Sequence, residues 1–218
     1  MLGAPASGKG TQAARIASHF RLPNLSTGAL IRSEQQRGSN LGALADNYLA
    51  GGGFLPDDLM AEIMTTWLQE SGAGGFVLDG FPRTLPQAEN FDAFLASAGQ
   101  RLDAVILLEA DLETLHRRIG SRVHCTRCGG TFQLNATIVP SGDCPKVDCQ
   151  GRLEPRSDDQ PEPYAGRLAN YHKLTKPLIE HYEQGGGLRR VDGNASQDEV
   201  FETILNQLGV PLPASPAN

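Results

Sequence analysis

The sequence predicts an α/β protein in which helices flank a parallel sheet and two lobes are inserted between its elements. A glycine-rich turn at residues 3–11 runs straight into a helix-like segment. Short apolar runs then alternate with longer helix-like stretches, and two stretches break that alternation. Alternating strands and helices are typical of parallel sheets with right-handed crossovers, which bind ligands at the carboxyl ends of their strands.

Composition narrows the class of protein. The chain has 218 residues, of which 39% are hydrophobic and 20% charged, so it can fold around one sizeable core. A net charge of −6 argues against a general nucleic-acid binder. No apolar run has the length of a membrane span and no signal peptide is present, so we expect a cytoplasmic protein without membrane contact. Disulfides are rare there, and the four cysteines need another explanation.

The predicted elements follow in chain order. We expect buried strands where short apolar runs occur, at residues 22–25, 75–79, 104–109 and 188–192. We expect helices at residues 11–19, 57–70, 85–98, 111–119, 163–184 and 197–208.

The start of the chain and three further segments depart from this pattern. Only two residues precede Gly3, whereas a central strand needs about five, so we expect the first strand to be truncated and the functional protein to begin upstream. Residues 26–55 are helix-like with a glycine hinge signal at 51–53, and residues 125–156 are rich in Cys, Gly and Pro. Both read as inserted lobes, and we expect a mobile tail at 211–218.

The glycine-rich turn predicts a phosphate site. Backbone N–H groups in such a loop point at phosphate oxygens, the following helix adds its dipole, and Lys9 adds a point charge. The strict pattern has Ser or Thr directly after the lysine, whereas here Gly10 intervenes before Thr11. The alternative is an ordinary surface turn.

The cysteines predict a zinc site. Cys125 and Cys128 form one close pair, and Cys144 and Cys149 form a second after fifteen residues, a spacing that suits tetrahedral Zn²⁺. The second pair is wider than usual, so four thiols without metal, or a site completed by another group, stay open. His124 and Asp148 are adjacent candidates that four cysteines make unnecessary.

Two further motifs lie at expected strand ends. Asp79 precedes Gly-Phe-Pro and then Arg83, and an acid beside a phosphate loop suits Mg²⁺ held through water. Alone, this motif would be a turn signal. Ser26-Thr27-Gly28 followed by Arg32 is by itself a helix N-cap.

Taken together, the motifs resemble the adenylate kinases of the bacterial long-lid type, from the phosphate loop to about residue 208. Gly-x-Pro-x-x-Gly-Lys-Gly-Thr, Ser-Thr-Gly, Asp-Gly-Phe-Pro-Arg-Thr, Arg-Ser-Asp-Asp and Val-Asp-Gly occur in the family's order. The resemblance implies the P-loop nucleoside monophosphate kinase fold. It divides the chain into a core (1–25, 56–120 and 159–210), an AMP-binding lobe (26–55), a zinc-containing lid (121–158) and the flexible tail (211–218).

The resemblance also implies site residues. The residues implied for ATP are Gly8, Lys9, Gly10, Thr11, Arg118, Arg122 and Ala195. Those implied for AMP are Thr27, Gly28, Arg32, Gly53, Leu55, Gly80, Arg83, Gln87, Arg156 and Arg167. Catalysis is implied for Lys9, Arg83, Arg122, Arg156, Arg167 and Asp79, with Asp79 holding the waters of Mg²⁺. Asp158 and Asp159 resemble lid acids that pair with arginines on closing.

The chain departs from the family pattern at two places. The pair of arginines before the first cysteine fits as Arg118 and Arg122 if the preceding helix loses one residue; without that shift Arg117 is chosen and Ser121 stands where an arginine belongs. We prefer the shifted reading because it also places the cysteines. Ala6 replaces a frequent loop glycine, which we expect to be tolerated only at negative φ.

The implied reaction is ATP + AMP ⇌ 2 ADP, catalysed by a monomer with Mg²⁺ on the nucleotide and structural Zn²⁺ in the lid. A pyrimidine-monophosphate kinase is the nearest rival, but that family tends to have Ala at the position of Thr27 and Asn at that of Gln87. GTP as donor stays open. A regulatory module without catalysis conflicts with the intact set of lysine and arginines, and a zinc-ribbon nucleic-acid binder leaves the phosphate loop unexplained.

Overall fold

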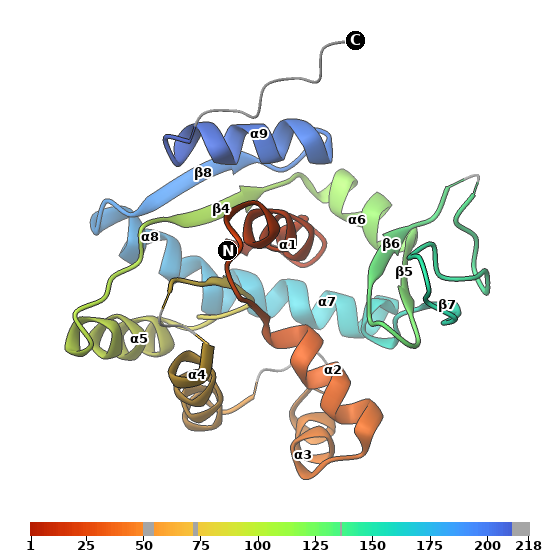
Figure 1. Ribbon diagram of the computed structural model, residues 1–218, viewed down its shortest axis with the longest axis horizontal. Coiled ribbons are helices and arrows are strands. Elements are labelled where there is room, and N and C mark those ends of the chain that lie inside the picture. Colours follow the sequence, from red (N-terminus) through yellow and green to blue (C-terminus); the bar gives the residue numbers. More distant parts are fainter. Residues whose placement is uncertain (50–54, 72–73, 136, 211–218) are drawn as a thin grey trace. The chain divides into compact units, whose positions relative to one another are not determined.

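The computed structural model describes residues 1–49, 55–71, 74–135 and 137–210 (Figure 1). Two compact units are present. The first contains Met1–Thr27, Pro56–Ala110 and Tyr171–Asn218, and the second contains Gly28–Leu55 and Asp111–Asn170. The glycine hinge signal at 51–53 and the tail at 211–218 lie outside the described residues, so both stay predictions.

The first unit contains the predicted parallel sheet, in two pieces. β1 (Leu2–Gly3), β4 (Val105–Glu109) and β8 (Leu188–Asp192) form one piece in the order β1-β4-β8. β2 (Asn24–Ser26) and β3 (Val77–Asp79) form the other. Every pairing is parallel, which confirms the predicted α/β class. The first strand has only two residues, and the Met1 ammonium donates to the Leu78 carbonyl across 2.8 Å.

Helices cover both faces of this sheet because β4 is apolar on both of its faces. Ile106 and Leu108 pack into a cluster with residues of α1 (Lys9–Phe20) and α9 (Gln197–Gln207). Val105 and Leu107 pack into a second cluster with residues of α5 (Leu85–Ser97) and α8 (Lys176–Gln184). All four side chains are less than one-tenth exposed. α4 (Asp57–Ser71) also belongs to this unit.

Local sequence explains where several helices begin. Thr84 caps α5 by accepting from the Gln87 N–H, and Pro86 fits the first turn. Ser196 and Glu199 form a capping box at the start of α9. These start signals are local. Apart from the helix predicted at 163–184, the predicted helix boundaries differ from the observed ones by at most two residues.

The single helix predicted at 163–184 is wrong. α7 (Pro161–Asn170) ends first, a π-helical turn covers Tyr171–Thr175, and α8 follows. Pro177 lies in the first turn of α8 and has no N–H to continue the regular ladder, which explains why the helix does not run through unbroken.

The second unit contains both inserted stretches. α2 (Thr27–Arg37) and α3 (Asn40–Leu49) make the first, while α6 (Leu112–Gly120) leads into the second. β5 (Arg122–Cys125), β6 (Thr131–Gln133) and β7 (Leu153–Pro155) form an antiparallel sheet in the order β6-β5-β7, followed by the short helix η1 (Ser157–Asp159).

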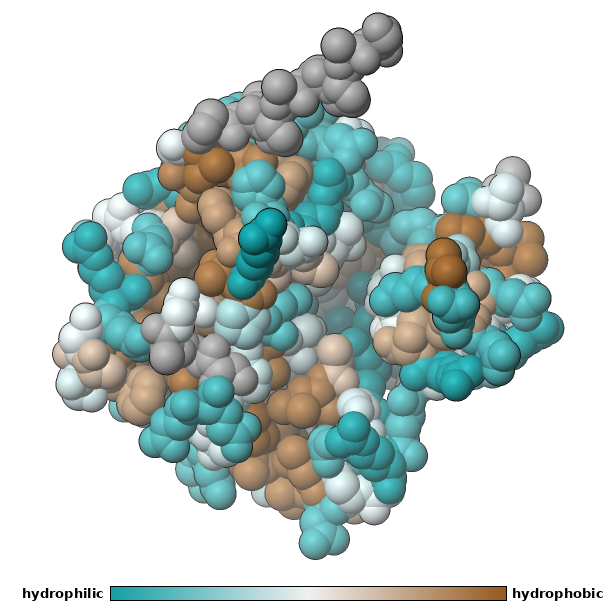
Figure 2. Space-filling view, in the orientation of Figure 1, coloured by the Kyte–Doolittle hydropathy of each residue, from teal (hydrophilic) through white to brown (hydrophobic). Residues whose placement is uncertain are grey.

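The surface of the β5–β7 insert is mixed in character. Figure 2 shows hydrophilic side chains over this part of the face, interrupted by small apolar areas. Within the described residues, Val139 and Val147 are its exposed large hydrophobic side chains. Such scattered apolar residues are ordinary for a protein surface and mark no docking site.

Among the described residues, no helix combines the length and apolar character that crossing a membrane requires.

Candidate active site

The phosphate loop joins β1 to α1. Gly3 has φ 141°, and a β-carbon there would lie 2.5 Å from the Leu108 carbonyl oxygen, so this position requires glycine. Gly8 caps α1 at φ 103° and has no side chain to occupy the first-turn N–H groups. Lys9 donates from Nζ to the Ala4 carbonyl across 2.7 Å, which holds its charge over the loop. N–H groups, helix dipole and ammonium together suit a phosphate.

The expectation for Ala6 is wrong. Its φ is 69°, in the left-handed region, instead of negative. The loop turns too tightly for an extended residue here, since the Ser7 N–H donates back to Ala4 at 3.1 Å and Gln12 to Gly8 at 3.0 Å. A methyl group is small enough to fit, at a backbone cost of about 1–2 kcal/mol.

Asp79 ends β3 beside the start of α1. Its Oδ2 accepts from Ser26 Oγ across 3.0 Å, and a β-carbon on Gly10 would lie 3.1 Å from the same oxygen. The carboxylate therefore lies against the first turn after the phosphate loop. Oxygen ligands of this kind suit Mg²⁺, which keeps several waters and takes one or two carboxylates. The residues present fit a nucleotide-bound magnesium ion.

Thr27, Gly80 and Arg83 meet where β2 and β3 end. Thr27 donates to the Gly80 carbonyl at 3.1 Å, and Arg83 donates from Nε to the same oxygen at 2.7 Å. Gly80 has φ 86°, and a β-carbon on it would lie 2.6 Å from Thr27 Oγ1. Thr175 donates to the Arg83 carbonyl across 3.0 Å, so hydrogen bonds hold both the side chain and the backbone of Arg83. The Phe81–Pro82 peptide bond between them is cis.

The buried amide of Gln87 lies in the next turn. Its Oε1 accepts from the Arg83 N–H at 2.8 Å, and its Nε2 donates to Asp57 Oδ1 at 2.6 Å. Asp57 also accepts from Thr84 Oγ1, at 3.2 Å to Oδ2. Sequence reasoning missed Asp57 and Thr175 as partners of this site. An acid in the first turn of a helix was the only signal for Asp57, and Thr175 had none.

A second group of charged side chains lies within the second unit. Arg122 pairs with both carboxylate oxygens of Asp159, from Nε at 2.6 Å and from Nη2. Arg167 reaches the same carboxylate at 3.1 Å and Asp158 Oδ2 at 3.0 Å. Arg156 donates from Nε to Asp158 at 2.8 Å. These five residues form the arginine–aspartate cluster, and the side chains of Arg122, Arg156 and Asp159 are at most one-tenth exposed.

Electrostatics show that positive charge exceeds negative charge in this cluster. Burial, and after it the charge of the nearby Arg156, lowers the pKa of Arg32 to about 10. Burial alone would raise the pKa of Asp158, but its hydrogen bond with Arg156 and the charges of Arg156, Arg167 and Arg32 hold it well below its usual range. With Arg32 added to the three arginines of the cluster, four arginines face its two aspartates. Such a surplus suits phosphate, which guanidinium groups bind in a bidentate manner.

The contacts around α6 differ between the residues of the two readings of the lid entry, whose choice stays a prediction. Arg122 belongs to the arginine–aspartate cluster, whereas Ser121 Oγ bonds to Gln133 of β6. Arg117 donates to Thr114 on its own helix at 3.3 Å, and Arg118 lies in the last turn of α6.

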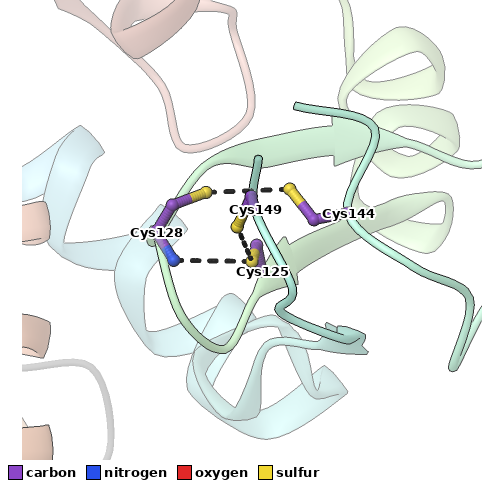
Figure 3. A group of neighbouring side chains, drawn as sticks. All are labelled: Cys125, Cys128, Cys144 and Cys149. Carbon is purple, nitrogen blue, oxygen red and sulfur yellow. Dashed lines mark hydrogen bonds between the residues drawn. The ribbon is translucent and has the colours of Figure 1, made fainter. Parts of the chain in front are cut away.

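The four cysteines converge at one point, as Figure 3 shows. Their Sγ atoms all lie within 4.8 Å of one another, with 3.6 Å between Cys125 and Cys149 and 3.8 Å between Cys128 and Cys144. Tetrahedral Zn²⁺ with Zn–S bonds of about 2.3 Å places sulfurs about 3.8 Å apart. All four are free thiols. The donor set therefore fits zinc.

The surroundings affect the thiols of this group in opposite ways. Cys125 Sγ accepts backbone N–H bonds from Arg127 and Cys128, both at 3.4 Å. Burial opposes ionisation of Cys125, but these donors outweigh it and lower its pKa to about 6. Burial raises the pKa of Cys144 to about 12. Among the described residues, His124 bonds to the Glu154 carbonyl at 3.0 Å and is outside the sulfur group.

The remaining predicted residues occupy varied places. Ala195 packs against the hydrophobic cluster of α1 and β4. Two residues earlier in the chain, a β-carbon on Gly193 would lie 3.3 Å from the Ser7 carbonyl oxygen. This places the β8–α9 turn beside the phosphate loop. A β-carbon on Gly28 would lie 3.1 Å from Arg32 Nη1, and Leu55 is buried. Gly53 lies outside the described residues.

The predicted site residues thus form two sets, each assembled within one unit. The first unit holds the phosphate loop, Thr27, Asp79, Arg83 and Gln87. The second holds Arg32, Arg118, the arginine–aspartate cluster and the four cysteines.

Known proteins with similar sequences place this arrangement in context. The family model described as adenylate kinase matches residues 1–187. An adenylate kinase of Agathobacter rectalis is 42% identical over 212 residues, covering 96% of this chain and 98% of its own. That of Lachnospira eligens is also 42% identical with the same coverage. That of Caldanaerobacter subterraneus subsp. tengcongensis is 43% identical over 209 residues, 95% of this chain and 94% of its own.

Proposed function

The chain belongs to the adenylate kinase family, and from this premise we propose how its residues share the transfer of a phosphoryl group from ATP to AMP, which yields two ADP. The chain is a phosphotransferase of the nucleoside monophosphate kinase type. The observation that carries the proposal is a glycine-rich phosphate loop with Asp79 and Arg83 at the neighbouring strand ends, in a chain that also holds a cluster of arginines.

Phosphoryl transfer needs little covalent chemistry from a protein, because positioning and neutralisation of spread charge supply most of the rate. Lys9 and the N–H groups of Gly8, Gly10 and Thr11 hold the donor's phosphates in this proposal. Arg83 holds the acceptor phosphate, and its hydrogen bonds to Gly80 and Thr175 support this role by fixing its position. Arg122, Arg156 and Arg167 neutralise the phosphoryl group in transit.

Asp79 would hold a nucleotide-bound Mg²⁺ through water. Its contact with Ser26 and its place beside Gly10 support this role. A magnesium ion held there would offset negative charge on the donor's phosphates. Ser26 keeps the carboxylate turned toward the phosphate loop.

We assign the acceptor site to residues around the ends of β2 and β3. Thr27, Gly80 and Gln87 would line the adenine, while Arg32, Arg83, Arg156 and Arg167 meet its phosphate. Gly28, Gly53 and Leu55 complete the assigned site. The buried hydrogen bonds of Thr27 and Gln87 support a site that reads the polar edge of one base, because a wrong base would leave those groups unpaired.

The donor site also takes Arg118, Arg122 and Ala195. Ala195 lies in the turn between β8 and α9, and this turn is beside the phosphate loop, which supports its assignment. We propose ATP as the donor, with GTP as the alternative that an assay separates.

We propose that Cys125, Cys128, Cys144 and Cys149 hold structural zinc. Four thiolates leave no open position for substrate, so the ion would stabilise the β5–β7 insert instead of reacting. We further propose a core of 1–25, 56–120 and 159–210, an acceptor lobe of 26–55 and a lid of 121–158, in a monomer that acts in the cytoplasm. Mobile lobes would exclude water and so prevent hydrolysis of ATP.

A coupled assay over nucleotide pairs tests the assignment of substrates. With ATP as donor, we expect kcat/KM for AMP to exceed that for CMP and UMP. With AMP as acceptor, we expect kcat/KM for ATP to exceed that for GTP. Faster phosphorylation of CMP or UMP than of AMP would contradict the acceptor assignment.

A further inference from the structure

Both ends of the buried Gln87 amide are already held by the protein. Oε1 accepts from the Arg83 backbone N–H at 2.8 Å, and Nε2 donates to Asp57 Oδ1 at 2.6 Å. Gln87 is 4% exposed. An amide oxygen accepts two hydrogen bonds and an amide nitrogen donates two, so the contacts within the described part of the chain leave one position at each end for a ligand.

The two partners fix which way the amide faces. A backbone N–H only donates and an ionised carboxylate only accepts. If the amide turned over, its NH₂ would face the Arg83 N–H and its oxygen would face the Asp57 carboxylate. Both hydrogen bonds would be lost and two repulsive contacts made, so the amide has one stable orientation.

Asp57 is itself held in place. It stands in the first turn of α4, where the helix dipole favours a negative charge. Oδ2 also accepts from Thr84 Oγ1 at 3.2 Å, and Thr84 caps α5, the helix that carries Gln87. Asp57 therefore connects the start of α4 to Gln87 of α5, which lies 30 residues further along the chain and which it orients.

We propose that Asp57 is a positioning residue that sets the base specificity of the acceptor site by locking the Gln87 amide. Adenine presents an N6–H donor beside the N1 acceptor, whereas a 6-oxopurine presents an O6 acceptor beside an N1–H donor. One fixed amide matches one of these edges and opposes the other. An amide free to turn could match both. This inference rests on the proposed placement of Gln87 at the acceptor base.

Inosine monophosphate is the sharpest probe, because it differs from AMP only at this edge of the base. We compare kcat/KM for AMP and inosine monophosphate in the wild type, Asp57→Ala and Asp57→Asn. Loss of a hydrogen bond to a charged group should lower the AMP preference of Asp57→Ala by about tenfold or more. The AMP preference of Asp57→Asn should lie between those of the wild type and Asp57→Ala. The oxygen of the new amide still accepts a hydrogen bond, but this amide can itself turn over.

Asp58→Ala is the matched control. It removes the same charge from the same helical turn, but Asp58 is exposed and accepts only from Leu59 of its own helix within the described residues. Its AMP preference should equal that of the wild type. A purely structural loss in Asp57→Ala would slow both substrates equally and leave the preference unchanged.

The outcomes separate this inference from the proposed function. A wild type that fails to phosphorylate AMP overturns the function. Gln87→Ala with an unchanged preference overturns the placement of Gln87 and this inference with it. If Gln87→Ala lowers the preference while Asp57→Ala and Asp57→Asn both keep the wild-type value, the role of Asp57 alone is overturned. Thermal unfolding shows which variants are folded. If Asp57→Ala does not fold, the AMP preference of Asp57→Asn tests the role of Asp57 instead.

Discussion

Arg122 and Asp159 form a two-point ion pair in which the arginine side chain is 10% exposed and the carboxylate 5%. They stand 37 residues apart in the chain, so the pair connects β5 to the segment after β7. A phosphate that binds these arginines competes with an aspartate already in place. Arginines to which we assign the transferred phosphoryl group thus also hold this insert together.

Replacing Asp159 by Asn should destabilise the protein by about 3 kcal/mol, because removing one partner of a buried pair leaves an uncompensated charge. Urea unfolding measures the change. Asp143→Asn is the control, since its pair with Arg152 is between 60% and 83% exposed and should contribute less than about 1 kcal/mol. Equal losses from both variants would contradict the structural role of the buried pair.

The lowered pKa of Asp158 predicts how the stability of the protein depends on pH. Its folded pKa lies below the ordinary value of 3.8, so its contribution is complete above that value and is lost as pH falls through the folded pKa. Thermal midpoints measured from about pH 6 down to about pH 2.5 should fall less steeply for Asp158→Asn than for the wild type. Parallel curves would show that this carboxyl is not held by its arginines.

Arg83 should matter for transfer more than for binding, because the charge it faces grows toward the transition state. Arg83→Ala should lower kcat by about 100-fold or more, on the order of 3 kcal/mol, by analogy with the loss of one oxyanion donor. Arg101→Ala changes an exposed arginine in the same unit and should leave kcat unchanged. Near-normal turnover of Arg83→Ala would remove it from the catalytic set.

The cysteine cluster predicts bound zinc with a structural role. Elemental analysis of protein never exposed to chelator should find one zinc ion per chain, as four converging thiols require. Cys128→Ser should lose the zinc and unfold at a lower temperature, yet keep most activity in the cold. Metal-free wild-type protein would refute the zinc site, and a folded, zinc-loaded but inactive Cys128→Ser would refute the purely structural role.

Some of this site was predictable from the sequence because its signals are local. Lys9 follows its glycines directly, Asp79 and Arg83 share one short motif, and the cysteine pairs are close in the chain. The charge partners of Arg122 and Arg167 needed the family resemblance, since no local pattern joins them. Asp57 and Thr175 were missed because their partners lie far away along the chain, at Gln87 and Arg83.

Backbone detail was the least predictable part. Ala6 adopts a positive φ that its side chain disfavours, because the loop's own hydrogen bonds determine the turn. The apolar pattern of residues 163–184 is helical throughout and does not show the π-helical turn at Tyr171–Thr175. The turn at Ala6 follows from the loop's hydrogen bonds, and the π-helical turn from the missing N–H of Pro177.

The central claim is reversible transfer between two nucleotides without loss of phosphate to water. Phosphorus NMR of the enzyme with Mg²⁺ tests it most directly, started once from ATP plus AMP and once from ADP alone. The account predicts that both reactions reach the same mixture of ATP, ADP and AMP, with no inorganic phosphate formed. Steady release of inorganic phosphate, or an ADP solution that stays unchanged, would contradict it.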